Sequence, residues 1–341
     1  MKLRPIPDEV PLDNDPIARA ATRERRVHRF LDAEVDARNA IYAALGANRP
    51  LLVQGEPGVG KTQLAEAVAK HYQFLLLTLT VDARTEARDL MYSFDAVRRL
   101  SEAQLIGSLY PTSDGEELRK RRENLEADRF VVPGKLWWAF DHHTARQQAA
   151  KSGTPELFDE AQWKDSAGTV LLIDEIDKAE PDVPNGLLEP FGARQFQPPC
   201  GLDLVKAGNK PCLIIITTNR ERELPDPFLR RCAVLTLALP ERKDDPGNAP
   251  LRKFLVQRGE AHFPDAKGVV YDNKSILEHA AEALIDDRRR AVEEGLSLLP
   301  GQAEYLDLVR ATIASAPGDP MAQHQNFRKF APFFLKKQLI R

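Results

Sequence analysis

The chain has 341 residues, of which 43% are hydrophobic and 29% charged, and 48 Lys and Arg residues against 51 Asp and Glu residues give a net charge of −3. This composition excludes a chain that is disordered throughout, and it leaves no net positive charge to attract nucleic acid or an anionic membrane. The length corresponds to roughly two domains.

The cysteines and apolar segments predict a cytoplasmic protein. Three cysteines, Cys200, Cys212 and Cys232, are widely spaced and form no Cys-x-x-Cys pair, which argues against a disulfide framework or a cysteine zinc site. No apolar run approaches the roughly 20 residues of a membrane span, and the N-terminal residues carry no apolar signal core. We therefore expect a reducing compartment and no membrane span.

The first 33 residues predict a Pro-rich and basic N-terminal extension. Residues 1–16 are rich in Pro and Asp and are expected to be extended or disordered, while residues 16–30 could form a basic amphipathic helix with a solvated charged face. Apolar residues at helical spacing then predict a helix over 34–45, which ends before Gly46.

Five short apolar runs predict a parallel sheet. They cover 50–53, 74–81, 169–173, 211–218 and 233–239, and helical patterns separate them. Strands without polar alternation are typical of a sheet covered on both faces. This predicts an α/β domain over 34–240, with a long insertion at about 82–168 that includes helices at 85–100 and 115–128. Helical patterns at 251–260, 273–295, 302–315 and 321–339 predict an all-α domain over 241–341.

A glycine-rich sequence directly after the first of these strands predicts a phosphate site. It matches Gly-x4-Gly-Lys-Ser/Thr in full, and it lies between a strand and a helix. In this arrangement backbone N–H groups and the helix N-terminus bind phosphate, the lysine reaches the β- and γ-phosphates, and the threonine ligates Mg²⁺. The expected nucleotide-binding residues are Gly55, Glu56, Pro57, Gly58, Val59, Gly60, Lys61, Thr62 and Gln63.

An acidic pair follows the third apolar run. Asp174 and Glu175 lie at the carboxyl end of a predicted parallel strand, the edge where ligands bind in open α/β sheets. We expect Asp174 to bind Mg²⁺ and Glu175 to act as the general base that polarises the attacking water. Asp177 and Lys178 are expected to cap and begin the next helix.

Polar residues after the fourth run are further candidates. Asn219 could hydrogen-bond the water or the γ-phosphate, or it could simply form a turn. Arg230 and Arg231 could supply a guanidinium that stabilises transition-state charge in a neighbouring subunit, although the motif alone favours a surface helix end.

The remaining polar and aromatic clusters carry no clear chemistry. His142 and His143 lack further metal-spaced ligands and predict a solvated loop. Trp137 and Trp138 predict packing in a core or a subunit interface, with contact to a substrate as an alternative. The run 288–290 of three arginines reads as a solvated charged surface.

Taken in order, these motifs resemble the AAA+ ATPases, and specifically the MoxR-like branch with its helix-2 insertion and dynein-related AAA domain. The sequences that carry the resemblance are RPLLVQGEPGVGKTQLAEAVA, ARDLMYSFDAVRRL, PGKLWWAF, VLLIDEIDKAEPDVPNGLLEPFGARQFQPP and IIITTNRERELPDPFLRR, within about 34–240. The segment 82–168 is similar to the family's insertion, 195–210 to its hairpin before sensor 1, and the helical tail to its lid.

The resemblance implies a ring-forming, Mg-dependent ATPase, usually a hexamer with ATP between subunits. It identifies 55–62 with the Walker A loop, Asp174 and Glu175 with the Walker B pair, Asn219 with sensor 1, and Arg230 or Arg231 with the arginine finger. One departure concerns the lid, where the family often has a sensor-2 arginine but this chain has Leu-Pro-Gly-Gln over 299–302.

The sequence is compatible with three functions. The first is a chaperone-like ATPase that remodels a protein partner, which the resemblance suggests is a von Willebrand factor A domain protein. The second is a nucleic-acid-linked NTPase related to restriction GTPases, against which the near-neutral charge counts. The third is a nucleotide-gated binding module with little turnover, against which Glu175 counts.

Overall fold

The computed structural model describes residues 4–12, 24–30, 35–109, 125–242, 244–245, 247–268, 270–296 and 299–335. The chain forms two compact units. The first combines Met1–Asn39, Val53–His71 and Leu235–Arg341, and the second combines Ala40–Leu52 with Tyr72–Val234.

A five-stranded sheet forms the α/β core, in the strand order β11-β3-β10-β7-β4. The pairs β10–β7 and β4–β7 are parallel. All five predicted strands are present and the expected fold class is confirmed. Their bounds are β3 Leu51–Gly55, β4 Phe74–Thr80, β7 Gly168–Asp174, β10 Cys212–Thr218 and β11 Ala233–Leu237.

Strands β7 and β10 are apolar along their whole length because neighbours cover them on both faces. Every residue of β10 is buried, as are all residues of β7 except Asp174. In the register, Ile216 lies opposite Ile173, so both strands end at the same edge of the sheet. That edge carries the polar residues that follow each strand.

Helices precede and follow the first strand of the sheet. Helix α1, Val35–Ala47, confirms the predicted helix over 34–45 within the described residues, but it continues through Gly46, where the sequence predicts its end. Helix α2, Lys61–Tyr72, begins directly after the glycine-rich loop, as the sequence predicts.

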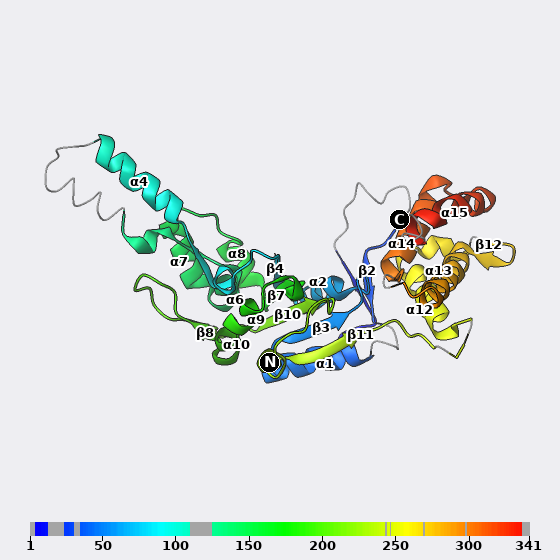
Figure 1. Ribbon diagram of the computed structural model, residues 1–341, viewed down its shortest axis with the longest axis horizontal. Coiled ribbons are helices and arrows are strands. Elements are labelled where there is room, and N and C mark those ends of the chain that lie inside the picture. Colours follow the sequence, from blue (N-terminus) through cyan, green and yellow to red (C-terminus); the bar gives the residue numbers. More distant parts are fainter. Residues whose placement is uncertain are drawn as a thin grey trace. The chain divides into compact units, whose positions relative to one another are not determined.

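The insertion between β4 and β7 is a mixed subdomain of the second unit. Helix α6 packs on β4 and β7 (Figure 1). Strand β5 pairs with β6 antiparallel. The predicted helix over 85–100 is divided by β5, and of the one expected over 115–128 residues 115–124 lie outside the described part. The bounds are α3 Ala87–Met91, β5 Tyr92–Phe94, α4 Ala96–Leu109, η2 Ala127–Phe130, β6 Val131–Pro133, α6 Lys135–Phe140, α7 His142–Ser152 and α8 Glu160–Asp165.

The aromatic residues of this insertion form part of the core. Trp137 and Trp138 are buried, in agreement with the prediction of packing. The prediction of a solvated loop at His142 is wrong, because the residue is 1% exposed and its ring packs against both Phe158 and Trp163, with centroid distances of 5.1 and 4.9 Å. A sequence pattern does not show this contact, since both ring partners lie 16 or more residues away.

Short elements connect β7 to β10 and β10 to β11. The expected hairpin over 195–210 is present as the antiparallel pair β8–β9. The bounds are η3 Ile176–Lys178, α9 Asp182–Gly186, α10 Leu188–Ala193, β8 Gln195–Phe196, β9 Val205–Lys206 and α11 Asp226–Leu229.

The N-terminal segment contributes strands rather than the expected helix. Strand β1, Glu9–Pro11, pairs antiparallel with β2, Val27–Arg29, so the helix predicted over 16–30 is wrong at its C-terminal end, and 16–23 lie outside the described residues. Glu24 binds Arg310 through both carboxylate oxygens, at 2.6 and 2.9 Å. Arg26 binds Glu66 of α2 in the same way, at 2.7 and 2.5 Å. Tertiary ion pairs thus decide the path of this segment.

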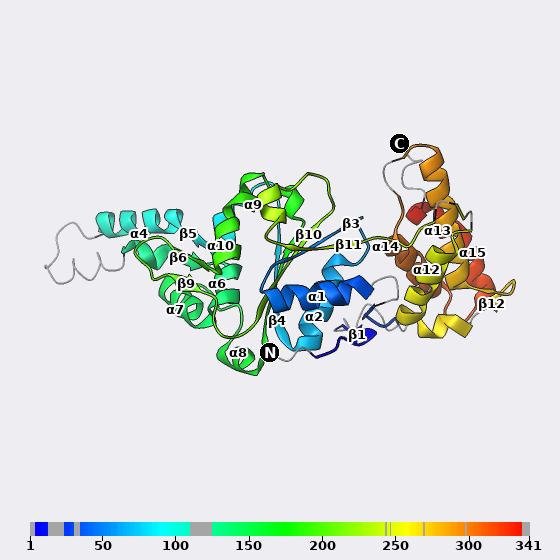
Figure 2. The ribbon, with the colours of Figure 1, turned by 90° about the horizontal axis from the view of Figure 1, so that it is seen from below.

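The C-terminal part of the first unit is helical, as the sequence predicts (Figure 2). Helices α12 to α15 enclose a separate apolar core that includes Leu255, Leu284 and Val309. The elements are α12 Ala249–His262, η4 Pro264–Gly268, β12 Val270–Tyr271, β13 Lys274–Ser275, α13 Ile276–Glu293, α14 Gln302–Ser315 and α15 Pro320–Leu335. The last residues of the helix expected over 321–339 lie outside the described part.

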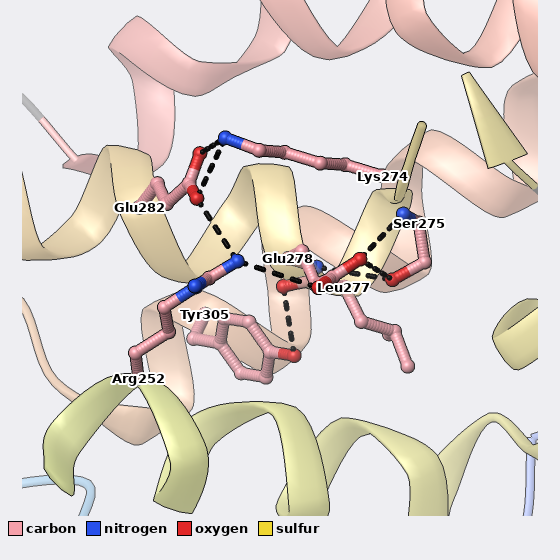
Figure 3. Close-up of polar contacts among 7 residues, drawn as sticks. All are labelled: Arg252, Lys274, Ser275, Leu277, Glu278, Glu282 and Tyr305. Carbon is pink, nitrogen blue, oxygen red and sulfur yellow. Dashed lines mark hydrogen bonds and ion pairs between the residues drawn. The ribbon is translucent and has the colours of Figure 1, made fainter. Parts of the chain in front are cut away.

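Polar contacts join three of these helices (Figure 3). Arg252 of α12 contacts Glu278 and Glu282 of α13 at 3.3 and 3.1 Å. Ser275 and Glu278 form a capping box at the start of α13, which satisfies backbone N–H groups that a helix leaves unpaired. The buried hydroxyl of Tyr305 in α14 donates to the carbonyl oxygen of Leu277 at 3.3 Å, so α14 is also held to α13.

Candidate nucleotide site

The phosphate-binding loop connects β3 to α2 in the first unit. Gly58 and Gly60 have φ values of +77° and +96°, a backbone conformation that favours glycine. A Cβ on Gly55 would lie 2.2 Å from the carbonyl oxygen of Leu237, so the backbones approach too closely for another residue. The loop and the first turn of α2 also contain the remaining candidates Glu56, Pro57, Val59, Thr62 and Gln63.

Lys61 places a buried positive charge at this loop. Its residue is 7% exposed, and Nζ donates to the carbonyl oxygens of Gly55 and Glu56 at 2.8 and 2.9 Å. Helix α2 begins at the same residue, so the positive end of its dipole adds to the positive potential. This combination fits a phosphate group.

The acidic pair lies at the end of β7 in the second unit. The hydroxyl of Thr217, on β10, donates to Oδ1 of Asp174 at 2.5 Å and accepts from the backbone N–H of Glu175 at 2.9 Å. Glu175 has φ 61° and ψ 50°, a left-handed conformation that costs a non-glycine residue about 1–3 kcal/mol. The hydrogen bond from Glu175 to Thr217 helps to hold this conformation.

Asn219 and Lys178 both contact the carboxylate of Glu175. Nδ2 of Asn219 donates to Oε1 at 3.3 Å, and Nζ of Lys178 contacts Oε2 at 2.5 Å. The carboxylate, in turn, raises the pKa of Lys178 by accepting its hydrogen bond and by its charge. The structure therefore brings Asp174, Glu175 and Asn219 together.

The sequence predicts that Asp177 caps the following helix, but in the structure its side chain has another role. Its buried carboxylate accepts hydrogen bonds from the backbone N–H groups of Asn219 and Glu221, both at 3.0 Å. The loop after β10 offers unpaired backbone donors to this carboxylate, which explains the difference. Asp177 thus fixes the backbone of Asn219. The sequence pattern does not show this role, because the two residues are 42 positions apart.

Arg230 and Arg231 follow α11 and are exposed. The guanidinium of Arg231 donates to the carbonyl oxygen of Pro227 at 3.1 Å, while the carbonyl oxygen of Arg230 accepts from Arg49 at 3.2 Å. No contact between these two side chains and Glu175 or Asn219 is present in the described residues. Their exposure is consistent with a role towards a second subunit.

Arg288 lies beside the phosphate loop, although the sequence predicted a solvated side chain. The run 288–290 was expected to be solvated, but the Arg288 side chain is 4% exposed and binds Glu56 of the phosphate loop. Thr217 and Lys178 were not anticipated either. For Thr217, its position two residues before Asn219 offers a weak signal. For Arg288, nothing in the local pattern distinguishes it from Arg289 and Arg290.

The residues expected to bind Mg²⁺ fit a hard cation. Thr62 provides a hydroxyl oxygen in the first turn of α2, and Asp174 provides a carboxylate at the end of β7. Mg²⁺ prefers such oxygen ligands and usually keeps several waters in addition to substrate phosphates. Each of the two residues therefore offers, within its own unit, an oxygen of the kind that Mg²⁺ prefers.

The chain belongs to the AAA domain family, dynein-related subfamily, whose sequence model matches residues 50–232, more than half of its length. This match confirms the resemblance to a MoxR-like AAA+ ATPase that the sequence carries. AAA domains bind nucleotide, and the family supports ATPase activity in general.

Individual relatives cover the chain unevenly. Midasin of Giardia intestinalis is 38% identical over 65 residues, which are 18% of this chain and 1% of midasin, so the match spans a very small part of that protein. A RuvB mutant of Thermotoga maritima is 15% identical, covers 89% of this chain and 71% of its own, and has a TM-score of 0.42. A candidate ATPase of Cytophaga hutchinsonii is 14% identical, with 86% and 78% coverage and a TM-score of 0.35.

Among the described residues, none of the helices combines the length and the apolar character needed to cross a membrane.

Proposed function

We propose that this protein hydrolyses ATP with Mg²⁺ in a ring of identical subunits, most simply a hexamer, and uses the cycle to remodel a protein partner. Residues 241–341 act as the lid, and the partner is a protein, for which a von Willebrand factor A domain protein is our candidate. We place this activity in the cytoplasm, where Cys200, Cys212 and Cys232, free in the structure, stay reduced.

The arrangement around Glu175 carries the proposal. A protein that only binds nucleotide needs the phosphate loop, whereas hydrolysis also needs a base that orients water. Here Glu175 is held by Asn219, Thr217 and Lys178, on the strand end next to Asp174. Such ordering costs backbone strain at Glu175, which a binding module has no need to retain.

In the proposed reaction each side chain has one task. Lys61 and the loop N–H groups bind the phosphates, and Thr62 and Asp174 hold the cation, which stabilises charge on the phosphate oxygens when bound. Glu175 accepts the proton of the attacking water, and Asn219 orients the Glu175 carboxylate. Arg230 or Arg231 stabilises transition-state charge at the site of a neighbouring subunit.

The test is hydrolysis of ATP and GTP as a function of protein concentration, with light scattering on the same samples. We expect turnover per chain to rise with concentration, together with an ATP-dependent ring mass. A monomer with concentration-independent turnover would contradict the ring and the shared site. GTP preference with stimulation by nucleic acid would favour the alternative of a nucleic-acid-linked NTPase.

Substitution of the base makes the test specific. Glu175→Gln should bind ATP but lose at least about a hundredfold in turnover, because general-base catalysis contributes about 10²–10⁴. Glu180→Gln is the matched control. Glu180 is an exposed glutamate five residues after Glu175, and it contacts Arg222. Equal turnover of the Glu175→Gln variant and the wild type would refute the assignment.

A further inference from the structure

Arg288 on helix α13 is a buried arginine beside the phosphate loop. Its side chain is 4% exposed, whereas those of Arg289 and Arg290 are each 49% exposed. Burying a guanidinium is unfavourable unless its charge and its donors are matched by partners. The contacts of Arg288 therefore indicate what this side chain holds in place.

Arg288 joins three different segments of the first unit. Nε donates to Oε1 of Glu241 at 2.6 Å, and Nη1 and Nη2 each lie 3.2 Å from Oε2 of Glu56. Nη1 also donates to the carbonyl oxygen of Pro300 at 2.7 Å. Glu56 is the second residue of the phosphate loop, and Pro300 lies just before the N-cap of α14. One guanidinium thus fixes the loop and the start of a lid helix together.

The first turn of α14 contacts the phosphate loop directly. A Cβ on Gly58 would lie 2.8 Å from Cβ of Ala303, and a Cβ on Gly301 would lie 3.5 Å from the carbonyl oxygen of Pro57. Helix α2 begins at this same loop. Two helix N-termini, each the positive end of a helix dipole, therefore meet at one place.

Gln302 provides an independent indication of a ligand at this place. It is 3% exposed, and its Oε1 has no hydrogen-bond partner among the residues that the structure describes. Its Nε2 lies 4.0 Å from the position that a Cβ would take on Gly60. Because buried amide groups are almost always hydrogen-bonded, Oε1 requires a donor, which an ordered water or a hydroxyl group of the ligand would supply, while Nε2 is the donor that can bind a phosphate oxygen.

We propose that Arg288 is a positioning residue for nucleotide binding, which holds Glu56 and Pro300 so that Gln302 and the N-terminus of α14 complete the phosphate site. The ligand class is a nucleoside di- or triphosphate. The inference rests on the nucleotide binding of the proposed function, and it is independent of turnover, ring assembly and the protein partner.

Nucleotide affinity is the direct test, measured with fluorescent ATP and ADP analogues on the full chain. Arg288→Ala should weaken both affinities about tenfold or more, because a hydrogen-bonded charge contributes about that much to a contact. Arg289→Ala is the matched control and should stay within about twofold. Equal affinity of the wild type and a folded Arg288→Ala variant would overturn the proposal.

Glu56→Gln keeps the proposal testable if Arg288→Ala does not fold. Glu56 is half exposed, and Arg288 keeps its contacts with Glu241 and Pro300 when the charge of Glu56 is removed. We expect a similar loss of affinity, and the double variant should bind no more than about twofold more weakly than the weaker single variant. Losses of affinity that multiply in the double variant would show that Arg288 and Glu56 act separately, and would refute the proposal that Arg288 acts by holding Glu56.

Gln302 and the steady-state kinetics separate positioning from a general loss of stability. Gln302→Ala should weaken nucleotide binding, whereas Gln323→Ala should not, although Gln323 is also a buried amide with an unpartnered Oε1 in the described residues. Arg288→Ala should raise KM more than it lowers kcat, because its contacts are with the phosphate loop and the start of α14. A fall in kcat at unchanged KM would contradict this role. Wild-type protein that binds no nucleotide would instead refute the proposed function itself.

Discussion

The buried carboxylate of Glu24 offers a quantitative test of how the N-terminal segment is held. Its side chain is 2% exposed and contacts Nε and Nη2 of Arg310 at 2.6 and 2.9 Å and Nδ1 of His262 at 3.6 Å. Burial alone would raise the pKa of Glu24, but the contacts with His262 and Arg310 outweigh it and lower the pKa from 4.5 to about 2. Glu24→Gln removes this charge with little change in volume.

The expected loss follows from the lowered pKa. Each pKa unit corresponds to about 1.4 kcal/mol, so the ionised Glu24 contributes roughly 3 kcal/mol at pH 7. Arg310 is 38% exposed and can be rehydrated, so we expect Glu24→Gln to cost about 2–3 kcal/mol in free energy of unfolding. Because the folded-state pKa is lowered, this contribution is complete above pH 4.5 and is lost as the pH falls towards 2. At pH 3.5 about 1.4 kcal/mol of it is gone.

Urea unfolding at pH 7 and pH 3.5 measures both quantities. The difference between the wild type and Glu24→Gln should be smaller by about 1.4 kcal/mol at the lower pH. Asp307→Asn is the control, because Asp307 contacts the same Arg310 but is 50% exposed, so its loss should be at most about 1 kcal/mol. A difference below about 0.5 kcal/mol at pH 7, or one that does not change with pH, would refute the reasoning.

Three further predictions follow from the same structure. Lys61→Ala should abolish nucleotide binding, measured by titration calorimetry, and ATP-dependent assembly; retained affinity would contradict its role. Arg230→Ala and Arg231→Ala should each be inactive or weak alone, and the one that removes the finger should recover activity when mixed with Lys61→Ala; no recovery for either would favour a structural role. Gly259→Ala should destabilise the lid by about 1–3 kcal/mol in urea, because a Cβ there would lie 2.4 Å from the hydroxyl of Tyr305, although alanine is normally favoured over glycine in a helix. A more stable Gly259→Ala variant would show that the helices relax freely.

Local patterns in the sequence were sufficient for the sheet, the lid helices and the phosphate loop. The strand β10 reads as a continuous apolar run because both its faces are buried, and α14 begins and ends where its pattern predicts. The loop before Lys61 needs glycine for its positive φ angles, a requirement visible in the sequence itself. These features depend on neighbours within a few residues.

Contacts between distant segments were decided only by the tertiary structure. Residues 27–29 have basic helical character in the sequence, but they pair with β1 and form a strand. Asp177 finds its backbone donors in the loop after β10, and Arg288 finds Glu56 at a separation of 232 residues. The sequence by itself therefore determined the family, the core elements and the candidate residues for binding phosphate, because each has a local physical signature. Which charges are buried, and which of three adjacent arginines faces the phosphate loop, depended on packing, because burial and partner choice are properties of the folded chain.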